Sequence, residues 1–284
     1  MATVDHAVTS LSFRILDVSS ARWPSSPWPS SPRIECEYAL ASPAFFTHWR
    51  EMVTQRLAEQ YAHVPVPEKT TAAYVLRWYL AIPSYLGGLL FHSARRVPSL
   101  APRQLSFRLD PVALQEVTLR PGRFWCLPGD PDAGHPDAVP VPDEAALGAV
   151  VRRQVIAHAT RFLTAYSPQV RFGRRTQWAA VTDALDSALL LAGRSFGSPH
   201  TSASDAYLVL TKGDKPLISA SRIRQVTDDR GRTHWTRRRS SCCFLYAMPG
   251  IEHPCPSCPR VDEAERVRIL STLDPAEPGR RDPP

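Results

Sequence analysis

The spacing of apolar residues predicts a chain built mostly of amphipathic helices. One helix is expected to begin at Ser42 and Pro43, because serine is a favourable N-cap and proline a favourable first helical residue. Its apolar residues recur every fourth position and share one face: Phe45, Trp49, Val53 and Leu57. A second helix spans about Thr70–Phe91, and Pro83 predicts a kink within it.

Two more amphipathic helices follow a segment rich in Pro, Gly and Asp. The apolar face of the first consists of Leu147, Val151, Val155, Phe162, Leu163 and Tyr166. The apolar face of the second consists of Trp178, Val181, Leu185 and Leu189. Glycine is common just beyond helix ends, so Gly193 is the expected end of the second helix. A terminal helix is expected from Val261 to about Leu273.

Short alternating segments between the helices predict β-strands. They lie at Leu11–Val18, Leu105–Leu109, Leu114–Leu119, Ala206–Leu210 and Pro216–Ser221, with a last strand from Thr233. Lys212-Gly213-Asp214 fits a hairpin turn, and Asp228–Gly231 marks another turn. The whole pattern predicts an α+β fold, with a mostly helical body, small antiparallel β segments and a C-terminal cysteine motif.

Composition suggests how the chain is divided. Residues 1–35 combine the first strand with a Pro/Ser-rich loop, and residues 36–120 form a first lobe of helices and strands. The Pro-rich segment 121–143 is the expected linker to a second helical and β lobe, residues 144–240. Residues 241–273 contain the cysteine motif and the terminal helix, and residues 274–284 are an expected disordered tail.

Composition and charge narrow the class of protein. Of the 284 residues, 43% are apolar, which is typical of a globular protein with a substantial core. The net charge of +7 and the pI near 9.3 favour an acidic partner, such as a ferredoxin, an anionic chelate, nucleic acid or a phospholipid surface. A generally arginine-rich composition explains the same charge equally well.

The first 20 residues show no export signal, and reduced thiols are typical of the cytoplasm, so we expect a cytoplasmic protein. The longest apolar run, Ala72–Phe91, contains Arg77 and Pro83. Placing an arginine in lipid costs about 2.5–3.5 kcal/mol on insertion scales. A core helix is therefore favoured, with peripheral membrane contact as the minority alternative.

The cysteines supply the strongest chemical signal. Cys242, Cys243, Cys255 and Cys258 follow the pattern C-C-x11-C-x2-C, whereas the rest of the chain has only Cys36 and Cys126. Thiolates are soft ligands that suit zinc or an iron–sulfur cluster. Adjacent cysteines point to opposite faces of an extended chain, so Cys242 and Cys243 can share a centre only if the backbone turns there. A cluster with two irons is larger than a single ion, so two adjacent cysteines can reach it more easily. This favours 2Fe–2S over zinc.

These residues resemble the C-terminal motif of FhuF-like ferric-siderophore reductases. The likeness rests on Arg238–Tyr246 (RRSSCCFLY), Pro249-Gly250 and Cys255–Pro259 (CPSCP), and extends less specifically over most of residues 40–265. The family pattern is expected to have ten residues between the second and third cysteines, and this chain has eleven. The additional residue falls in the loop Pro249–Pro254, where an insertion costs little.

The resemblance implies that the four cysteines hold a 2Fe–2S cluster. It further implies one-electron transfer to a ferric siderophore, of hydroxamate type, and release of Fe(II). The implied electron donor is a ferredoxin or a flavin reductase, and nucleic acid is not an expected partner. Of the residues before the cysteines, Arg238 and Arg239 are candidates to face the cluster with positive charge, and Ser241 to donate a hydrogen bond to sulfur.

Several alternatives remain open from the sequence. The main one is a structural zinc module with four cysteine ligands on a basic scaffold. A thiol–disulfide enzyme using Cys255 and Cys258, and a relative of siderophore synthetases, are weaker ones. His158, Cys36 and Cys126 are expected to be ordinary structural residues, and the carboxylates Asp183 and Asp186 are expected to have capping, salt-bridge or scaffold roles.

Overall fold

The structure, a computed structural model, describes residues 11–14, 32–61, 64–166, 168, 171–211, 215–249, 251 and 254–272. For residues 11–14 it describes the backbone only. The Pro/Ser-rich loop, the turn at Lys212–Asp214 and the tail 274–284 lie outside the described residues.

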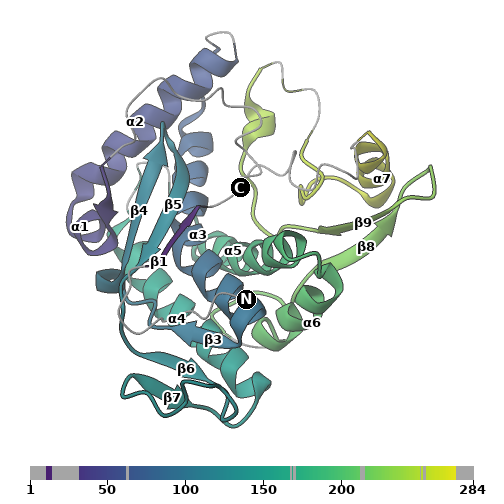
Figure 1. The fold of residues 1–284 in the computed structure, drawn as a ribbon. Helices are drawn as coiled ribbons and strands as arrows, with labels where there is room; N and C mark the ends of the chain where they lie inside the picture. Colours follow the sequence, from purple (N-terminus) through teal and green to yellow (C-terminus); the bar gives the residue numbers. More distant parts are fainter. Residues whose placement is uncertain are drawn as a thin grey trace.

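The described residues form an α+β fold, as expected from the sequence, with the helices predominating (Figure 1). The helices are α1 Cys36–Ala41, α2 Pro43–Gln60, α3 Glu68–Ala94, α4 Glu144–Ala165, α5 Arg174–Ser195, α6 Pro199–Val209 and α7 Glu263–Ser271. The 3₁₀ turns are η2 Pro102–Gln104 and η3 Leu245–Ala247. The strands are β1 Leu11–Arg14, β2 Ile34–Glu35, β3 Arg96–Pro98, β4 Leu105–Asp110, β5 Ala113–Leu119, β6 Phe124–Cys126, β7 Ala138–Pro140, β8 Ile223–Thr227 and β9 Thr233–Arg237.

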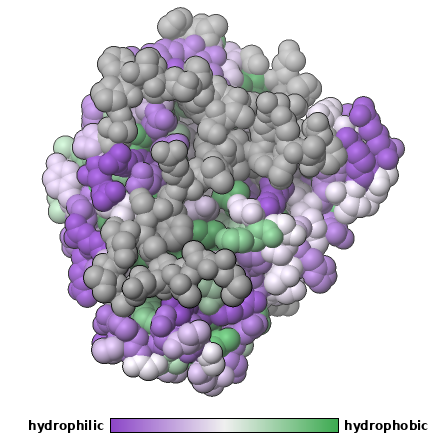
Figure 2. Space-filling model, viewed as in Figure 1, coloured by the Kyte–Doolittle hydropathy of each residue, from purple (hydrophilic) through white to green (hydrophobic). Residues whose placement is uncertain are grey.

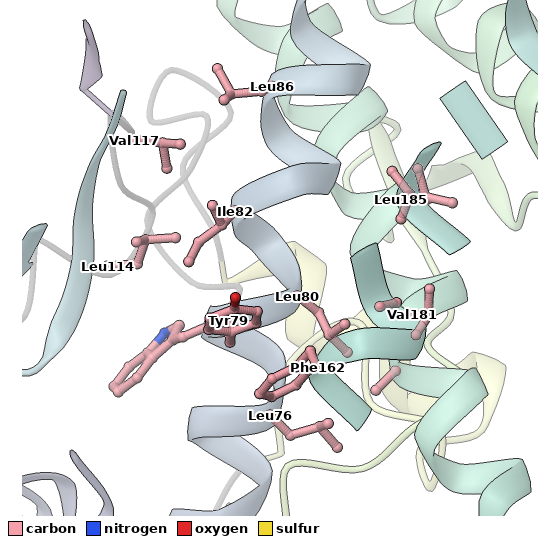
Figure 3. Packing of buried hydrophobic residues seen from close by; sticks show 14 of the residues in the cluster. Leu76, Tyr79, Leu80, Ile82, Leu86, Leu114, Val117, Phe162, Val181 and Leu185 are labelled. Atoms are coloured by element: carbon pink, nitrogen blue, oxygen red, sulfur yellow. The ribbon is translucent and has the colours of Figure 1, made fainter. Parts of the chain in front are cut away.

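Helix α3 runs through the middle of the molecule, with β4 and β5 on one side and α5 on the other (Figure 1). Figure 3 shows Leu114 and Val117 of β5 facing α3 from one side, and Val181 and Leu185 of α5 from the other. Most of α3 is buried because it is apolar on every face, which is the pattern of a core helix. Pro83 lies within α3 and does not end it.

Helix α2 begins at Pro43 as expected, although Ser42 makes no side-chain cap hydrogen bond. Its buried face contains Phe46 together with Trp49, Val53 and Leu57, and Phe45 is only partly buried. The predicted stripe was therefore wrong by one residue at its first position.

Small sheets flank the helices. The largest has the order β1-β5-β4-β2 with antiparallel pairing, and β8 pairs with β9 as an antiparallel hairpin. The third sheet, β3-β6-β7, departs from the expected antiparallel pairing because β6 and β7 are parallel. Both of these strands lie in the segment 121–143, and the buried apolar residues on either side of that segment belong to one core cluster.

The predicted strand at Ala206–Leu210 was wrong, because these residues belong mainly to α6, and Pro216–Ser221 is irregular rather than a strand. The turn at Asp228–Gly231 is present between β8 and β9, with Gly231 at a φ of 73°. The end of this hairpin is hydrophilic on the face drawn in Figure 2.

Helix α5 continues past the expected end at Gly193 to Ser195. A Cβ at Gly193 would lie 2.5 Å from the Cβ of Ser202 and 2.9 Å from the Cα of Pro199. This glycine therefore serves the close approach of α6 to α5 rather than the end of a helix.

Within the part of the chain that the structure describes, the helices are all too short or too polar to cross a membrane.

Candidate functional site

Asp183 of α5 anchors the segment that leads from β9 to the first cysteine pair. Its carboxylate accepts hydrogen bonds from the backbone N–H of Ser240 at 2.8 Å and of Ser241 at 2.7 Å. The hydroxyl of Ser241 donates to the same carboxylate at 2.6 Å, so it is directed to Asp183 and not to a sulfur. The helix thereby fixes the direction in which the chain enters the cysteine pair.

The backbone turns just after the adjacent cysteines, at Phe244. Phe244 has the left-handed conformation, with φ 58° and ψ 13°, which is uncommon for a residue other than glycine. Its N–H lies 3.3 Å from the Sγ of Cys242, and its carbonyl accepts a hydrogen bond of 3.1 Å from Thr70 of α3. The ring of Phe244 stacks on Phe172, with centroids 6.1 Å apart. These contacts hold the turn from both sides.

The second pair lies on a separate turn that is tied to the first segment. The N–H of Cys258 donates to the carbonyl of Cys255 at 2.9 Å, and the N–H of Arg239 donates to the carbonyl of Ser257 at 2.9 Å. The guanidinium of Arg266, which is fully buried, donates to the carbonyls of Pro256 and Cys258. Helix α7, which carries Arg266, therefore holds the second turn in place.

The four thiols contact one another in a closed ring. Cys242 forms side-chain hydrogen bonds with Cys243 and Cys258, and Cys255 forms them with the same two residues. The pKa values of Cys243 and Cys258 are lowered by the hydrogen bonds that these thiols accept. The pKa values of Cys242 and Cys255 are raised, first because each donates to Cys243. The sequence-predicted cysteines are thus brought together from two segments.

Arg239 lies against this ring. Its side chain is fully buried, and its Nη2 is 3.7 Å from the Sγ of Cys243 and also donates to the Sγ of Cys255. One guanidinium therefore contacts one cysteine of each pair. Arg238 is exposed and donates to the carbonyl of Pro259, the residue after Cys258, at 3.0 Å.

Further positive charge is buried beside the ring. Arg77 of α3 is 6% exposed, and its pKa is lowered to about 10, first by burial and then by the charge of Arg239. The buried Arg237 has its Nη1 4.0 Å from a carboxylate oxygen of Asp183. Burial, followed by the charge of Cys243, raises the pKa of Tyr74. The thiols thus lie in an unusually cationic interior.

The donor chemistry fits an all-thiolate centre. Cysteine thiolates are the ligands of 2Fe–2S clusters and of many zinc sites, and buried cations beside them stabilise their negative charge. Among the described residues, however, no group of three or more His, Cys, Asp or Glu side chains is placed so as to coordinate one metal ion. The four thiols as they stand in this structure are therefore not arranged as a metal site.

The surface beside the two turns is aromatic and basic. Tyr246 is 40% exposed, and the guanidinium of Arg260 lies over its ring at 4.2 Å and donates to its hydroxyl at 3.2 Å. Lys69 lies 4.6 Å from the ring centroid of Phe244. Cys242 and Cys255 are half-buried, whereas Cys243 and Cys258 are buried. Cys242 and Cys255 are therefore the more exposed of the four cysteines.

The remaining candidates have structural surroundings. Cys36 and Cys126 are buried and free, and burial raises the pKa of both thiols. His158 lies between the carbonyl of Leu100 at 2.7 Å and the hydroxyl of Tyr79 at 3.2 Å, and burial lowers its pKa to about 4. These contacts account for His158 as part of the core.

Sequence reasoning missed Arg77 and Arg266 as parts of the site. Arg77 carried a usable signal, because an arginine inside an apolar core helix needs nearby negative charge. Arg266 carried none, because it is one of several charged residues in a short amphipathic helix.

No family model matches this chain, and no curated protein is significantly similar to it.

Proposed function

We propose that the protein is a cytoplasmic ferric-siderophore reductase in which Cys242, Cys243, Cys255 and Cys258 hold a 2Fe–2S cluster. The observation that carries the proposal is the contact of buried Arg239 with one thiol from each cysteine pair. The motif's resemblance to FhuF-like reductases supplies the reaction.

The buried positive charge near the thiols supports a 2Fe–2S cluster as the bound group. Arg77, Arg237 and Arg239 are all buried near the thiols, and buried charge is costly unless opposite charge lies close by. Four thiolates around a metal centre have net negative charge and would stabilise these arginines. Positive charge beside sulfur also favours a reduced cluster over an oxidised one.

A bound 2Fe–2S cluster supplies one electron at a time, which suits reduction of Fe(III) to Fe(II). Cys242 and Cys255 are half-buried, and the exposed parts of the two turns carry aromatic and basic side chains, namely Tyr246, Arg260 and, over the ring of Phe244, Lys69. We propose that this surface receives a ferric siderophore of hydroxamate type. Its hard oxygen ligands suit Fe(III) and hold Fe(II) more weakly, so one electron from a ferredoxin or flavin reductase releases the iron.

The test begins with protein expressed with ample iron and purified without oxygen. We expect two irons and two sulfides per chain, visible thiolate-to-iron absorption, and a rhombic EPR signal after dithionite. The reduced protein, mixed with ferrioxamine B, should then bleach the ferric hydroxamate band and deliver Fe(II) to a ferrous chelator. Cys258→Ser should abolish the cluster signals, whereas the matched control Cys126→Ser should keep them.

A colourless protein with one zinc per chain under the same conditions would refute the proposal and favour a structural four-cysteine zinc module. A brown, redox-active protein that leaves ferrioxamine B untouched would instead refute the substrate and retain the electron carrier.

A further inference from the structure

Three side chains outside the cysteine site are joined in a Ser–His–Asp series. Nδ1 of His92, near the end of α3, lies 2.6 Å from the Oδ2 of Asp205 in α6. Nε2 of His92 lies 2.8 Å from the Oγ of Ser198, the residue that precedes α6. The carboxylate and the hydroxyl therefore contact opposite nitrogens of one imidazole ring.

The surroundings set the direction of these hydrogen bonds. Arg95 holds Asp205 in a two-pronged ion pair, with Nη2–Oδ1 at 2.9 Å and Nη1–Oδ2 at 3.1 Å. A carboxylate only accepts hydrogen bonds, so Nδ1 of His92 carries a hydrogen, and in the neutral imidazole Nε2 is then free to accept from the hydroxyl of Ser198. The side chains of His92 and Asp205 are 4% and 1% exposed. Such burial strengthens the contacts that the carboxylate of Asp205 makes with His92 and Arg95.

Ser198 has an unusual role for its position. It is the N-cap residue of α6, yet its side chain makes no cap hydrogen bond and is directed to His92 instead. A serine there ordinarily accepts from the N–H of the second or third helical residue. The N–H groups of His200 and Thr201 are therefore not used by this cap, and the helix N-terminus favours negative charge beside Ser198.

The serine is also accessible. Ser198 is half-buried, as is Pro199 after it, whereas Gly197 before it and His200, two residues further on, are exposed. Phe196 is 55% exposed, and its ring lies 5.9 Å from the ring of His92. An exposed aromatic side chain beside the serine offers a contact surface for an apolar acyl group.

We propose that Ser198, His92 and Asp205 form a second catalytic site, which hydrolyses carboxylic esters with a short apolar acyl group. A brace between α3 and α6 is the alternative role for these residues. The ion pair between Arg95 and Asp205 already joins α3 to α6, so a brace does not require the serine. This proposal is independent of the function proposed for the cysteines.

The reaction uses only these groups and water. The Oγ of Ser198 attacks the ester carbonyl while its proton passes to Nε2 of His92. The oxyanion is stabilised at the start of α6. The bond to the alcohol then breaks, and the alcohol leaves with that proton. A water molecule then adds to the acyl-serine as its proton passes to Nε2 of His92. The bond to Oγ breaks, that proton returns to Oγ of Ser198, and the carboxylic acid leaves.

The test uses the full chain with p-nitrophenyl butyrate and a fluorophosphonate probe. We expect p-nitrophenolate release and a phosphonyl adduct that mass spectrometry locates on Ser198. Ser198→Ala should reduce both to background, and His92→Gln should lower the rate by about 100-fold or more, the usual contribution of a general base. Ser204→Ala is the matched control, because Ser204 is exposed on the same helix and is expected to leave both unchanged.

Location of the adduct on the unaltered chain does not depend on whether any variant folds. An unlabelled wild-type chain, or one whose adduct lies elsewhere, would overturn the proposal and leave the three residues as a brace. Equal ester hydrolysis by folded Ser198→Ala and wild type would overturn it as well.

Discussion

Arg238 and Arg239 are neighbours in the sequence but occupy opposite environments. Arg238 is exposed, whereas Arg239 is fully buried against the thiols. Alternation of side chains along an extended segment predicts that the two diverge, but it does not say which one faces inward. In the folded chain, the hydrogen bonds of Ser240 and Ser241 to Asp183 determine that Arg239 faces inward. Asp183 is 57 residues from Ser240 in sequence, so this contact could not be seen in the local pattern.

Replacing Arg239 should lower the reduction potential of the iron-loaded protein. Arg239→Gln removes a positive charge in contact with two thiols, so the added negative charge of the reduced state becomes less favourable. We expect a fall on the order of 59 mV, which corresponds to a tenfold change for one electron. Potentiometric titration followed by EPR measures it. Arg238→Gln is the control, and equal potentials for both variants would contradict the role of Arg239.

Asp183→Asn should destabilise the fold around the first cysteine pair. The substitution keeps the size of the side chain but replaces the carboxylate, which accepts the hydrogen bonds from Ser240 and Ser241, with a neutral amide. A buried hydrogen bond lost in this way costs about 1–3 kcal/mol. Urea unfolding of the metal-free protein measures the loss, with exposed Asp229→Asn as the control. Similar stabilities for the two variants would show that Asp183 does not anchor the segment.

At the scale of elements, helix α6 illustrates how a short apolar run can mislead. Ala206–Leu210 has the length and composition of a buried strand, and periodicity alone does not separate the two for so few residues. The deciding signal lies upstream, where Ser198 and Pro199 form the same start pattern that correctly predicted α2 at Ser42 and Pro43. The long helices were predicted well because each repeats its apolar face over several turns.

The contact between α5 and α6 should depend on Gly193. Gly193→Ala places a methyl group against the Cβ of Ser202 and the Cα of Pro199. The Cα belongs to the backbone, so relieving this clash requires a shift of α6 and not only a side-chain rotation. We expect a loss of about 1–3 kcal/mol in the free energy of unfolding, typical of overpacking. Denaturant unfolding should show no more than about 0.5 kcal/mol for Gly129→Ala, whose new Cβ would meet nothing within 4 Å. A neutral Gly193→Ala would mean that the two helices separate easily.

At the scale of the molecule, the α+β class and the central buried helix could be predicted from the sequence, because the run at Ala72–Phe91 is apolar on every face. The grouping of the four cysteines was also predictable from their spacing. Their surroundings were not, because Arg77, Asp183 and Arg266 come from three different helices that only tertiary packing brings together. The parallel pairing of β6 and β7 was missed for the same reason.

Global stability should fall in mild acid because of His158. Burial lowers its pKa from 6.5 to about 4, so the unfolded chain binds more protons than the folded one between these values. Stability is therefore full above pH 6.5 and declines as the pH falls toward 4, by about 3 kcal/mol in total. Unfolding free energies of His158→Gln measured across this range should depend less on pH than those of wild type. Replacement of the exposed His48 by Gln should leave the pH dependence of wild type unchanged. If the stability of His158→Gln depended on pH as strongly as that of wild type, His158 would not be the source of the acid sensitivity.

The position of Arg266 on α7 has a consequence for the order of events during synthesis. The ribosome makes α3 and α5 first, and these helices supply Thr70, Arg77 and Asp183 before any cysteine of the motif emerges. The second cysteine turn follows, but the side chain that binds its carbonyls arrives only with α7. If the four cysteines hold the proposed cluster, its delivery would therefore be a late step in maturation, on helices that have already been synthesised.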